Sequence, residues 1–192
     1  MPPSTVLVAA PTCADYEPYF AQWWAAYEAF TYAQKSVYLV DTTPGTTAYY
    51  DTLVARGVPC VHAEPDPRPT GYLITGWKEM AKAAGSKTYV ASIEADTICP
   101  PETLTFLVEI ADRYNAAWVA HEYPDHNQNG GPICALGCTL VRVASLKAGI
   151  TGGWGDVVPD GHSVDAYIYD TIRGVNGRCI ELSNFLTIQH LP

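Results

Sequence analysis

Short apolar runs alternate with longer stretches of helical periodicity through the first 120 residues. The apolar runs, which are typical of strands buried on both faces of a parallel sheet, lie at 5–10, 37–40, 58–61 and 88–93. The stretches that favour helices lie at 15–34, 46–56, 71–84 and 100–114. This alternation predicts an α/β fold, with a mostly parallel central sheet that is flanked by helices and connected by right-handed crossovers.

Two kinds of loop interrupt this pattern. Residues 64–69 carry a proline at every second position, which excludes a helix and predicts an extended segment. Residues 121–132 are polar and rich in Gly and Asn, and they too are predicted to form a loop. The remaining expected elements are strands at 116–120, 134–143, 178–180 and 185–188, a glycine loop at 150–155 and a short helix at 163–173. We interpret this last part as a small antiparallel extension of the same sheet.

Composition supports one folded domain and limits the classes of molecule that it is expected to bind. The chain has 192 residues, 48% hydrophobic and 16% charged, which fits a single domain and excludes a disordered chain. Its net charge of −9 disfavours nucleic-acid binding through a broad basic face and leaves only a local basic strip open. No apolar run approaches the roughly 20 residues that span a bilayer. We therefore expect a cytoplasmic protein without a membrane segment, and the sequence leaves its oligomeric state open.

The six cysteines are not spaced like a metal site. Cys134 and Cys138 form the one close pair, and no second pair accompanies them. With no recognisable signal peptide, we expect reduced and mostly buried thiols.

Polar residues follow the predicted strands at their carboxyl ends, where ligands bind in open α/β sheets. Pro11 and Thr12 follow the first strand, and Asp41 follows the second. Glu94 and Asp96 follow the fourth strand, and two carboxylates at this spacing suit a hard divalent cation that keeps positions open for phosphate oxygens. Spacing alone leaves the alternative open that both acids cap the next helix or face water.

Taken together, these segments resemble the GT-A-fold glycosyltransferases of the family-two type, in particular the compact versions found in bacteriophages. The resemblance extends from Val6 to Leu191 and is carried by Val6–Thr12, Val37–Asp41, Tyr89–Asp96 and Pro100–Leu104. It implies a GT-A-type single domain over residues 1–192, in which residues 1–120 bind a nucleotide sugar and residues 121–192 face the acceptor. The sequence departs from the family in having Glu94 where the Asp-x-Asp motif usually begins with Asp.

The resemblance also implies which residues bind the donor, which we expect to be a UDP-sugar. Pro11 and Thr12 would line the base pocket, and Asp41 would hydrogen-bond the base. Glu94, with Ala95 beside it, would approach the ribose or assist the metal. Lys78 would help to neutralise the diphosphate; its alternative is a solvated lysine on a helix face.

A metal site follows from the same resemblance. Asp96 would hold Mn²⁺ or Mg²⁺ against the diphosphate of the donor. Thr187–His190 resembles the strand end that returns a histidine to the metal, so His190 is the second predicted ligand. A carboxylate with an imidazole favours manganese. The alternative for His190 is a frayed terminal side chain.

The acceptor side is predicted from the second half of the chain. The segment Gly161–Asp165 resembles the one that supplies the catalytic base of inverting enzymes, and Asp165 is its one acid. The alternative for Asp165 is an acid that stabilises the helix N-terminus. His162 is the reserve base, and Trp154 with Gly155 would stack on the acceptor. We expect Trp23, Trp24, Trp77 and Trp118 to be core residues.

The leading hypothesis is a metal-dependent, inverting glycosyltransferase that uses a nucleotide sugar. Its acceptor is predicted, narrowly, to be a hydroxymethylated pyrimidine in DNA, because Arg142, Lys147, Arg173 and Arg178 give the second half some basic character. A saccharide or small-molecule hydroxyl is the alternative acceptor. A non-catalytic nucleotide-sugar-binding module is a second class, and a nucleotidyltransferase is disfavoured because no Gly-rich basic loop follows the first strand.

Overall fold

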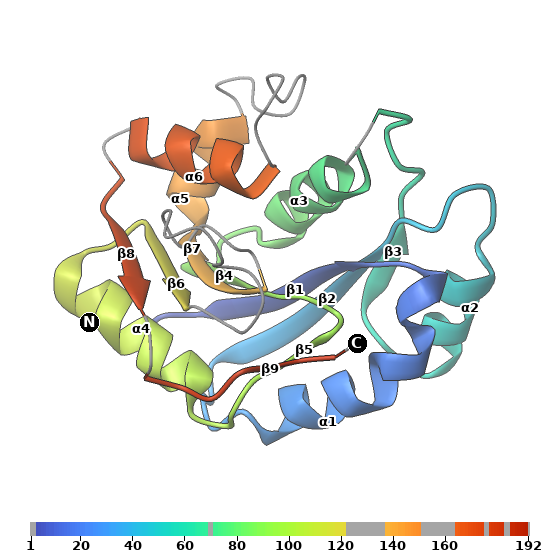
Figure 1. The fold of residues 1–192 in the computed structure, drawn as a ribbon, viewed down its shortest axis with the longest axis horizontal. Helices are drawn as coiled ribbons and strands as arrows, with labels where there is room; N and C mark the ends of the chain where they lie inside the picture. The colour runs from blue at the N-terminus through green and yellow to red at the C-terminus, as the bar shows by residue number, and fades with distance from the viewer. Residues whose placement is uncertain are drawn as a thin grey trace.

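The computed structural model describes residues 3–68, 71–121, 137–150, 164–174, 177–182 and 185–191. Across these residues, seven strands form one sheet in the order β3-β2-β1-β4-β7-β6-β8 (Figure 1). In chain order the strands are β1 (Val6–Thr12), β2 (Lys35–Asp41), β3 (Cys60–His62), β4 (Tyr89–Ile93), β6 (Trp118–His121), β7 (Cys138–Arg142) and β8 (Cys179–Leu182). Within this sheet β7 alone runs antiparallel to its neighbours, so the predicted mostly parallel α/β fold is confirmed.

Alternate residues of β1 pack into two cores on opposite faces of the sheet. Val6, Val8 and Ala10 belong to one core, and Leu7 and Ala9 belong to the other. All are buried, because a strand in the middle of a parallel sheet is covered on both sides. This explains why the sequence of β1 is continuously apolar.

The helices cover the two faces in separate layers (Figure 1). The face that contains Val8 is covered by α1 (Phe20–Ala29), α2 (Ala48–Ala55) and α4 (Thr103–Tyr114). The opposite face is covered by α3 (Gly71–Ala83), α5 (Val143–Gly149) and α6 (Val164–Gly174). Trp23, Trp77 and Trp118 are buried in these cores and Trp24 packs against one of them, as predicted. Within the described residues, no helix is both long enough and apolar enough to cross a bilayer.

A second, two-stranded antiparallel sheet returns the end of the chain to the carboxyl end of β4. It pairs β5 (Thr97–Ile98) with β9 (Gln189–His190), so that Thr97 faces His190. The N–H of Leu191 donates to the carbonyl of Asp96 at 2.7 Å. The predicted closing strand at 185–188 therefore lies a few residues later, at β9.

Several predicted boundaries are wrong for identifiable reasons. The helix predicted over 15–34 begins as a 3₁₀ helix, η1 (Ala14–Tyr19), which contains Pro18, and α1 ends at Ala29. Proline lacks an N–H for α-helical hydrogen bonding, which favours the tighter turn. Helix α5 was not predicted, because seven residues are too few to show a helical period. The extended segment before α3 is confirmed through residue 68.

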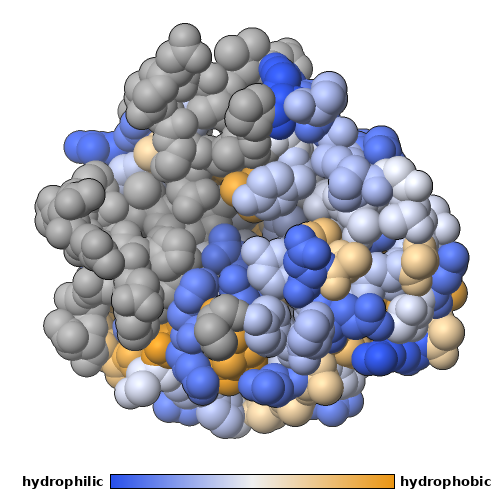
Figure 2. Space-filling view, turned by 45° about the vertical axis from the view of Figure 1, so that its right-hand side comes forward, coloured by the Kyte–Doolittle hydropathy of each residue, from blue (hydrophilic) through white to orange (hydrophobic). Residues whose placement is uncertain are grey.

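The described residues on the face shown in Figure 2 are largely polar, and the hydrophobic ones among them gather in small, separate groups. Over the described residues, the exposed large hydrophobic side chains are those of Val54, Tyr72, Tyr114 and Phe185. Tyr72 also lines both of the cavities described next.

Candidate functional site

Two adjoining cavities lie where β1 to β4 reach their carboxyl ends. The larger has a volume of about 570 Å³ and the smaller one of about 290 Å³. The two share lining residues, which are Cys13, Tyr16, Thr42 and Tyr72. They therefore form one continuous cleft at the place where open α/β sheets bind ligands.

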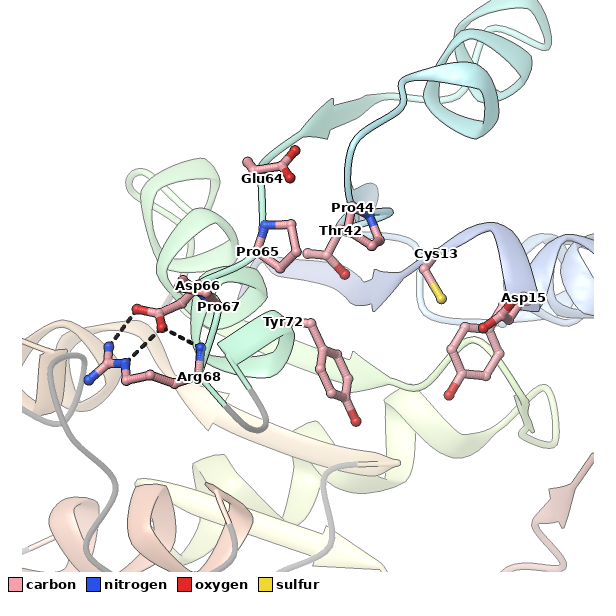
Figure 3. A pocket seen from close by; sticks show the side chains of 11 residues that line it. Cys13, Asp15, Thr42, Pro44, Glu64, Pro65, Asp66, Pro67, Arg68 and Tyr72 are labelled. Atoms are coloured by element: carbon pink, nitrogen blue, oxygen red, sulfur yellow. Dashed lines mark hydrogen bonds and ion pairs between the residues drawn. The ribbon is translucent and has the colours of Figure 1, made fainter.

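The larger cavity lies between the ends of β1 and β2 and the extended segment that follows β3 (Figure 3). Its lining comprises Cys13, Asp15, Tyr16, Thr42, Pro44, Glu64, Pro65, Asp66, Pro67, Arg68 and Tyr72. The segment after β3, which forms one wall of the larger cavity, is fixed to α3, because the N–H of Asp66 donates to the hydroxyl of Thr75 at 3.2 Å. A Cβ on Gly71 would lie 2.1 Å from the carbonyl oxygen of Asp66, so this close approach requires glycine.

Arg68, a basic residue in the lining of the larger cavity, is already paired with Asp66. Arg68 donates from Nε and Nη2 to the two carboxylate oxygens of Asp66, at 2.7 and 2.6 Å. These hydrogen bonds, with that from the Arg68 backbone N–H, lower the pKa of Asp66 to about 2, and Lys78 adds to the effect. Asp66 is therefore ionised at neutral pH and keeps the Arg68 side chain against the wall.

The smaller cavity brings together most of the residues predicted for the donor and the metal. Its lining includes Pro11 and Thr12 from β1, and Glu94, Ala95 and Asp96 after β4. His190 from β9 completes it. Residues 12 and 96 line the same cavity because parallel strands β1 and β4 end side by side, whereas His190 arrives through the β5–β9 pairing.

Asp96 carries an unsatisfied oxygen in this cavity. Its Oδ2 lies 3.3 Å from Nε2 of His190. Its Oδ1 is buried and has no hydrogen-bond partner among the described residues. An orphaned buried carboxylate oxygen is costly in a folded protein, so it points to a ligand that the protein binds here.

The side chains of Asp96 and His190 fit a divalent cation. Asp96 and His190 offer carboxylate oxygen and imidazole nitrogen, a combination that suits Mn²⁺ and that Mg²⁺ accepts through oxygen. In the part of the chain that the structure describes, no group of three or more His, Cys, Asp or Glu side chains is arranged to hold a metal ion. A cation held by this pair alone would keep its other ligand positions for a substrate.

Tyr16 is a neutral hydrogen-bond donor at the junction of the two cavities. Burial, followed by the negative charge of Asp96, raises the pKa of its phenol. The hydroxyl therefore keeps its proton at neutral pH. Tyr72 lies at the same junction, and Figure 3 shows its side chain extending into the middle of the cleft.

Asp41, which was predicted to contact a nucleobase, is fully buried at the end of β2. It accepts hydrogen bonds from the N–H and hydroxyl of Thr43 and lies 2.8 Å from Nδ1 of His62. It does not belong to the described lining of either cavity. The structure thus places it behind the cleft wall.

Other predicted residues lie outside the cleft or outside the described residues. Lys78 is half-buried on α3 and acts on Asp66. Trp154, Gly155 and His162 lie outside the described residues. Asp165 is the second residue of α6, and its side chain lies outside the described part of the structure.

The basic residues of the second half lie largely at the opposite edge of the sheet. Arg142 faces Tyr89, the first residue of β4, whereas the cleft follows the last residue of that strand. Lys147 donates to the carbonyl of Gly85, which precedes β4. Arg178 bonds the carbonyl of Tyr114, just before β6. These three side chains therefore do not extend the cleft.

Solved structures similar to this chain are glycosyltransferases. TarS from S. aureus in complex with UDP superimposes with a TM-score of 0.68 at 14% identity, over 98% of this chain and 60% of that one. The mannosyltransferase PcManGT from Pyrobaculum calidifontis, in complex with GDP-Man and Mn²⁺, gives 0.71 at 15% identity, over 97% and 57%. Glucosyl-3-phosphoglycerate synthase from Mycobacterium tuberculosis gives 0.60 at 15% identity, over 98% and 72%.

The fold is that of the GT-A glycosyltransferases. The chain spans 37% of a TarS chain and at most about 60% of the TarS and mannosyltransferase structures that it matches. No protein-family model and no curated protein matches the sequence. The expected fold is confirmed, and the roles of individual residues stay predictions.

Sequence reasoning missed part of the cleft. Tyr16 was absorbed into a predicted α-helix, and Tyr72 was one of many aromatic residues in a helical stretch. Glu64 stood in a segment that was identified as a loop without chemistry. The position of Glu64 in the chain could have identified it. Residues shortly after a parallel strand belong to the ligand-binding edge of the sheet, and Glu64 comes shortly after β3 as Glu94 comes after β4.

Proposed function

We propose that this protein is a metal-dependent glycosyltransferase that transfers a sugar from a nucleotide sugar to a hydroxyl acceptor. The observation that carries the proposal is the unpartnered Asp96 oxygen beside His190, in a cleft at the carboxyl ends of the strands. The GT-A fold supports it, because similar structures contain UDP in one case and GDP-Man with Mn²⁺ in another.

In this proposal the two cavities divide the donor between them. The larger one takes the nucleoside, and the smaller one takes the diphosphate beside Glu94 and Ala95. Pro11 and Thr12, which were predicted to line the base pocket, line the smaller cavity, so in this proposal they lie beside the diphosphate instead. Asp96 and His190 hold the divalent cation, which supplies positive charge against the negative charge that develops on the leaving diphosphate. The protonated hydroxyl of Tyr16 donates a hydrogen bond to the same group. A UDP-sugar is the donor that we expect first.

Asp165 is proposed as the general base of an inverting transfer. The acceptor hydroxyl gives its proton to the carboxylate as its oxygen bonds to the anomeric carbon, and the bond from that carbon to the phosphate oxygen breaks. The electron pair leaves with the nucleoside diphosphate. His162 is the reserve candidate, and Trp154 with Gly155 is proposed to contact the acceptor.

The acceptor is proposed by its reacting group, a hydroxyl. The basic residues that favoured hydroxymethylated DNA lie mainly at the sheet edge opposite to the cleft, so they give that acceptor no support. A saccharide or small-molecule hydroxyl is therefore the acceptor class to test alongside DNA.

The test is a donor screen with Mn²⁺, which measures nucleoside diphosphate release and glycosylated product with saccharides or hydroxymethylated DNA. One donor is expected to give release that rises with acceptor. Asp96→Asn is expected to lower turnover by about 100-fold or more, and Asp165→Asn by about 100- to 10,000-fold with donor binding retained.

Glu109→Gln, an exposed change on α4, is the control and is expected to leave turnover unchanged. No release from any donor with any divalent metal would overturn the proposed function. Turnover of Asp165→Asn at the parental rate would refute only the assignment of the base.

A further inference from the structure

The carboxylate of Asp41 is engaged inside the protein. Its Oδ1 accepts from the Thr43 N–H at 3.0 Å and from the Thr43 hydroxyl at 2.5 Å. Its Oδ2 lies 2.8 Å from Nδ1 of His62, and the side chain is 0% exposed. Asp41 is therefore held within the protein and is not part of the described lining of the larger cavity.

His62 also lies near a second carboxylate, that of Glu64, which is exposed at the surface. Nε2 of His62 lies 3.6 Å from Oε2 of Glu64, and the N–H of Gly45 donates to Oε1 at 3.1 Å. Asp41 fixes the imidazole from behind, so its other nitrogen faces Glu64. The Gly45 turn, with φ of +70°, presents its N–H from the loop after β2. Glu64 is therefore contacted both by β3 and by the loop after β2.

Glu64 differs from Asp41 in its access to the ligand. Its side chain is 65% exposed and lines the larger cavity, next to Pro65 and across from Thr42 (Figure 3). The other carboxylate on this stretch of the wall, Asp66, is paired in both oxygens with Arg68. Asp66 accepts three hydrogen bonds from Arg68, whereas Glu64 accepts one N–H, that of Gly45, at 3.1 Å from Oε1 and 3.4 Å from Oε2, so of these two acids Glu64 keeps more acceptor capacity.

We propose that Glu64 selects the nucleobase of the donor by accepting its ring N–H, and that Asp41 and His62 position it. The inference rests on the proposed function and adds the class of base. Uracil and guanine carry a ring N–H next to a carbonyl group, whereas cytosine and adenine present a bare ring nitrogen there at neutral pH. A carboxylate accepts from the former and is repelled by the latter, because it has lone pairs and no proton.

The test measures binding of UDP, GDP, CDP and ADP, each with Mn²⁺, by calorimetry to the parent and to Glu64→Gln. The parent is expected to bind UDP or GDP roughly 10- to 100-fold more tightly than CDP and ADP, the range for a hydrogen bond to a charged group. The separate UDP and GDP arms tell which ring N–H is read. Glu64→Gln is expected to lose most of this preference, because an amide can also donate to a bare ring nitrogen. Glu109→Gln, the matched control, is expected to keep it.

The outcomes separate the two proposals. If Glu64→Gln keeps the parental preference, or if the parent binds all four nucleotides equally, the role of Glu64 is overturned while nucleotide binding still supports the proposed function. If the parent binds none of the four, the proposed function fails and this inference fails with it. Equal melting temperatures of parent and variant would confirm that a change in preference is not a folding defect.

Discussion

At the scale of single residues, the cleft depends on carboxylates in three different situations. Asp41 is buried and hydrogen-bonded to Thr43 and His62, Asp66 is paired with Arg68, and Asp96 keeps an oxygen that has no partner among the described residues. The first two organise the wall, because their charges are satisfied within the protein. The third is available to a ligand. The same side-chain chemistry thus supports the wall at Asp41 and Asp66 and is available for binding at Asp96.

Asp41→Asn tests the supporting role. The amide removes the charge that accepts from Thr43 and His62, so we expect a loss of about 1–3 kcal/mol in the free energy of unfolding. Chemical denaturation measures it. Asp170→Asn, on an exposed acid of α6, is the control and is expected to stay within about 0.5 kcal/mol. Equal stabilities of the two variants would show that the buried contacts of Asp41 contribute nothing.

At the scale of elements, α3 fixes the geometry of the cleft. A Cβ on Gly76 would lie 2.7 Å from the ring of Pro11, and one on Gly71 would meet the backbone of Asp66. The helix therefore sits directly against the end of β1 and against the wall of the larger cavity. Tyr72, one residue into the helix, is placed at the junction of the cavities by these contacts.

Gly76→Ala tests this placement. The added methyl group forces α3 away from Pro11, so we expect destabilisation of about 1–3 kcal/mol together with weaker nucleotide binding. Thermal unfolding with and without nucleotide measures both. Gly174→Ala, at the end of α6 where a Cβ meets no atom within 4 Å, is the control and is expected to be neutral or slightly stabilising. A Gly76→Ala protein as stable as this control would contradict the close packing.

Much of this element structure is readable from the sequence, because β1 and β4 are buried on both faces and largely apolar, and β2 contains the apolar run 37–40. Their carboxyl ends share one edge, which predicts that Pro11 and Glu94 meet. The position of His190 follows from the family resemblance, since a two-residue strand such as β9 has no periodicity.

The contacts between Asp41 and His62, behind the wall of the larger cavity, could not be predicted from the apolar pattern of the strands. Asp41 and His62 are paired across β2 and β3, and this pairing depends on how the two strands align in the folded protein. The strand predicted at 58–61 stops one residue short of His62, so the pairing was invisible. The role of Glu64 depends on Gly45 and His62 together, which come from two different segments.

At the scale of the whole molecule, the sheet separates two kinds of surface. The carboxyl ends of β1 to β4 carry the cleft with its acids, and the opposite edge carries Arg142, Lys147 and Arg178, which bond backbone carbonyls there. The net charge of −9 and this distribution oppose an anionic polymer at the cleft except through local contacts. A cation at Asp96 would offset the negative potential that a diphosphate meets on entry.

The most direct measurement of this account is nucleotide binding with and without Mn²⁺, by calorimetry, in the parent and in Asp96→Asn. The account predicts that Mn²⁺ tightens binding of UDP or GDP by about tenfold or more in the parent, the size of an ordinary coupling between two ligands. It predicts no such effect in Asp96→Asn and a full effect in Glu109→Gln. Equal affinities with and without Mn²⁺, or an undiminished metal effect in Asp96→Asn, would contradict the claim that this corner of the cleft holds a cation against a diphosphate.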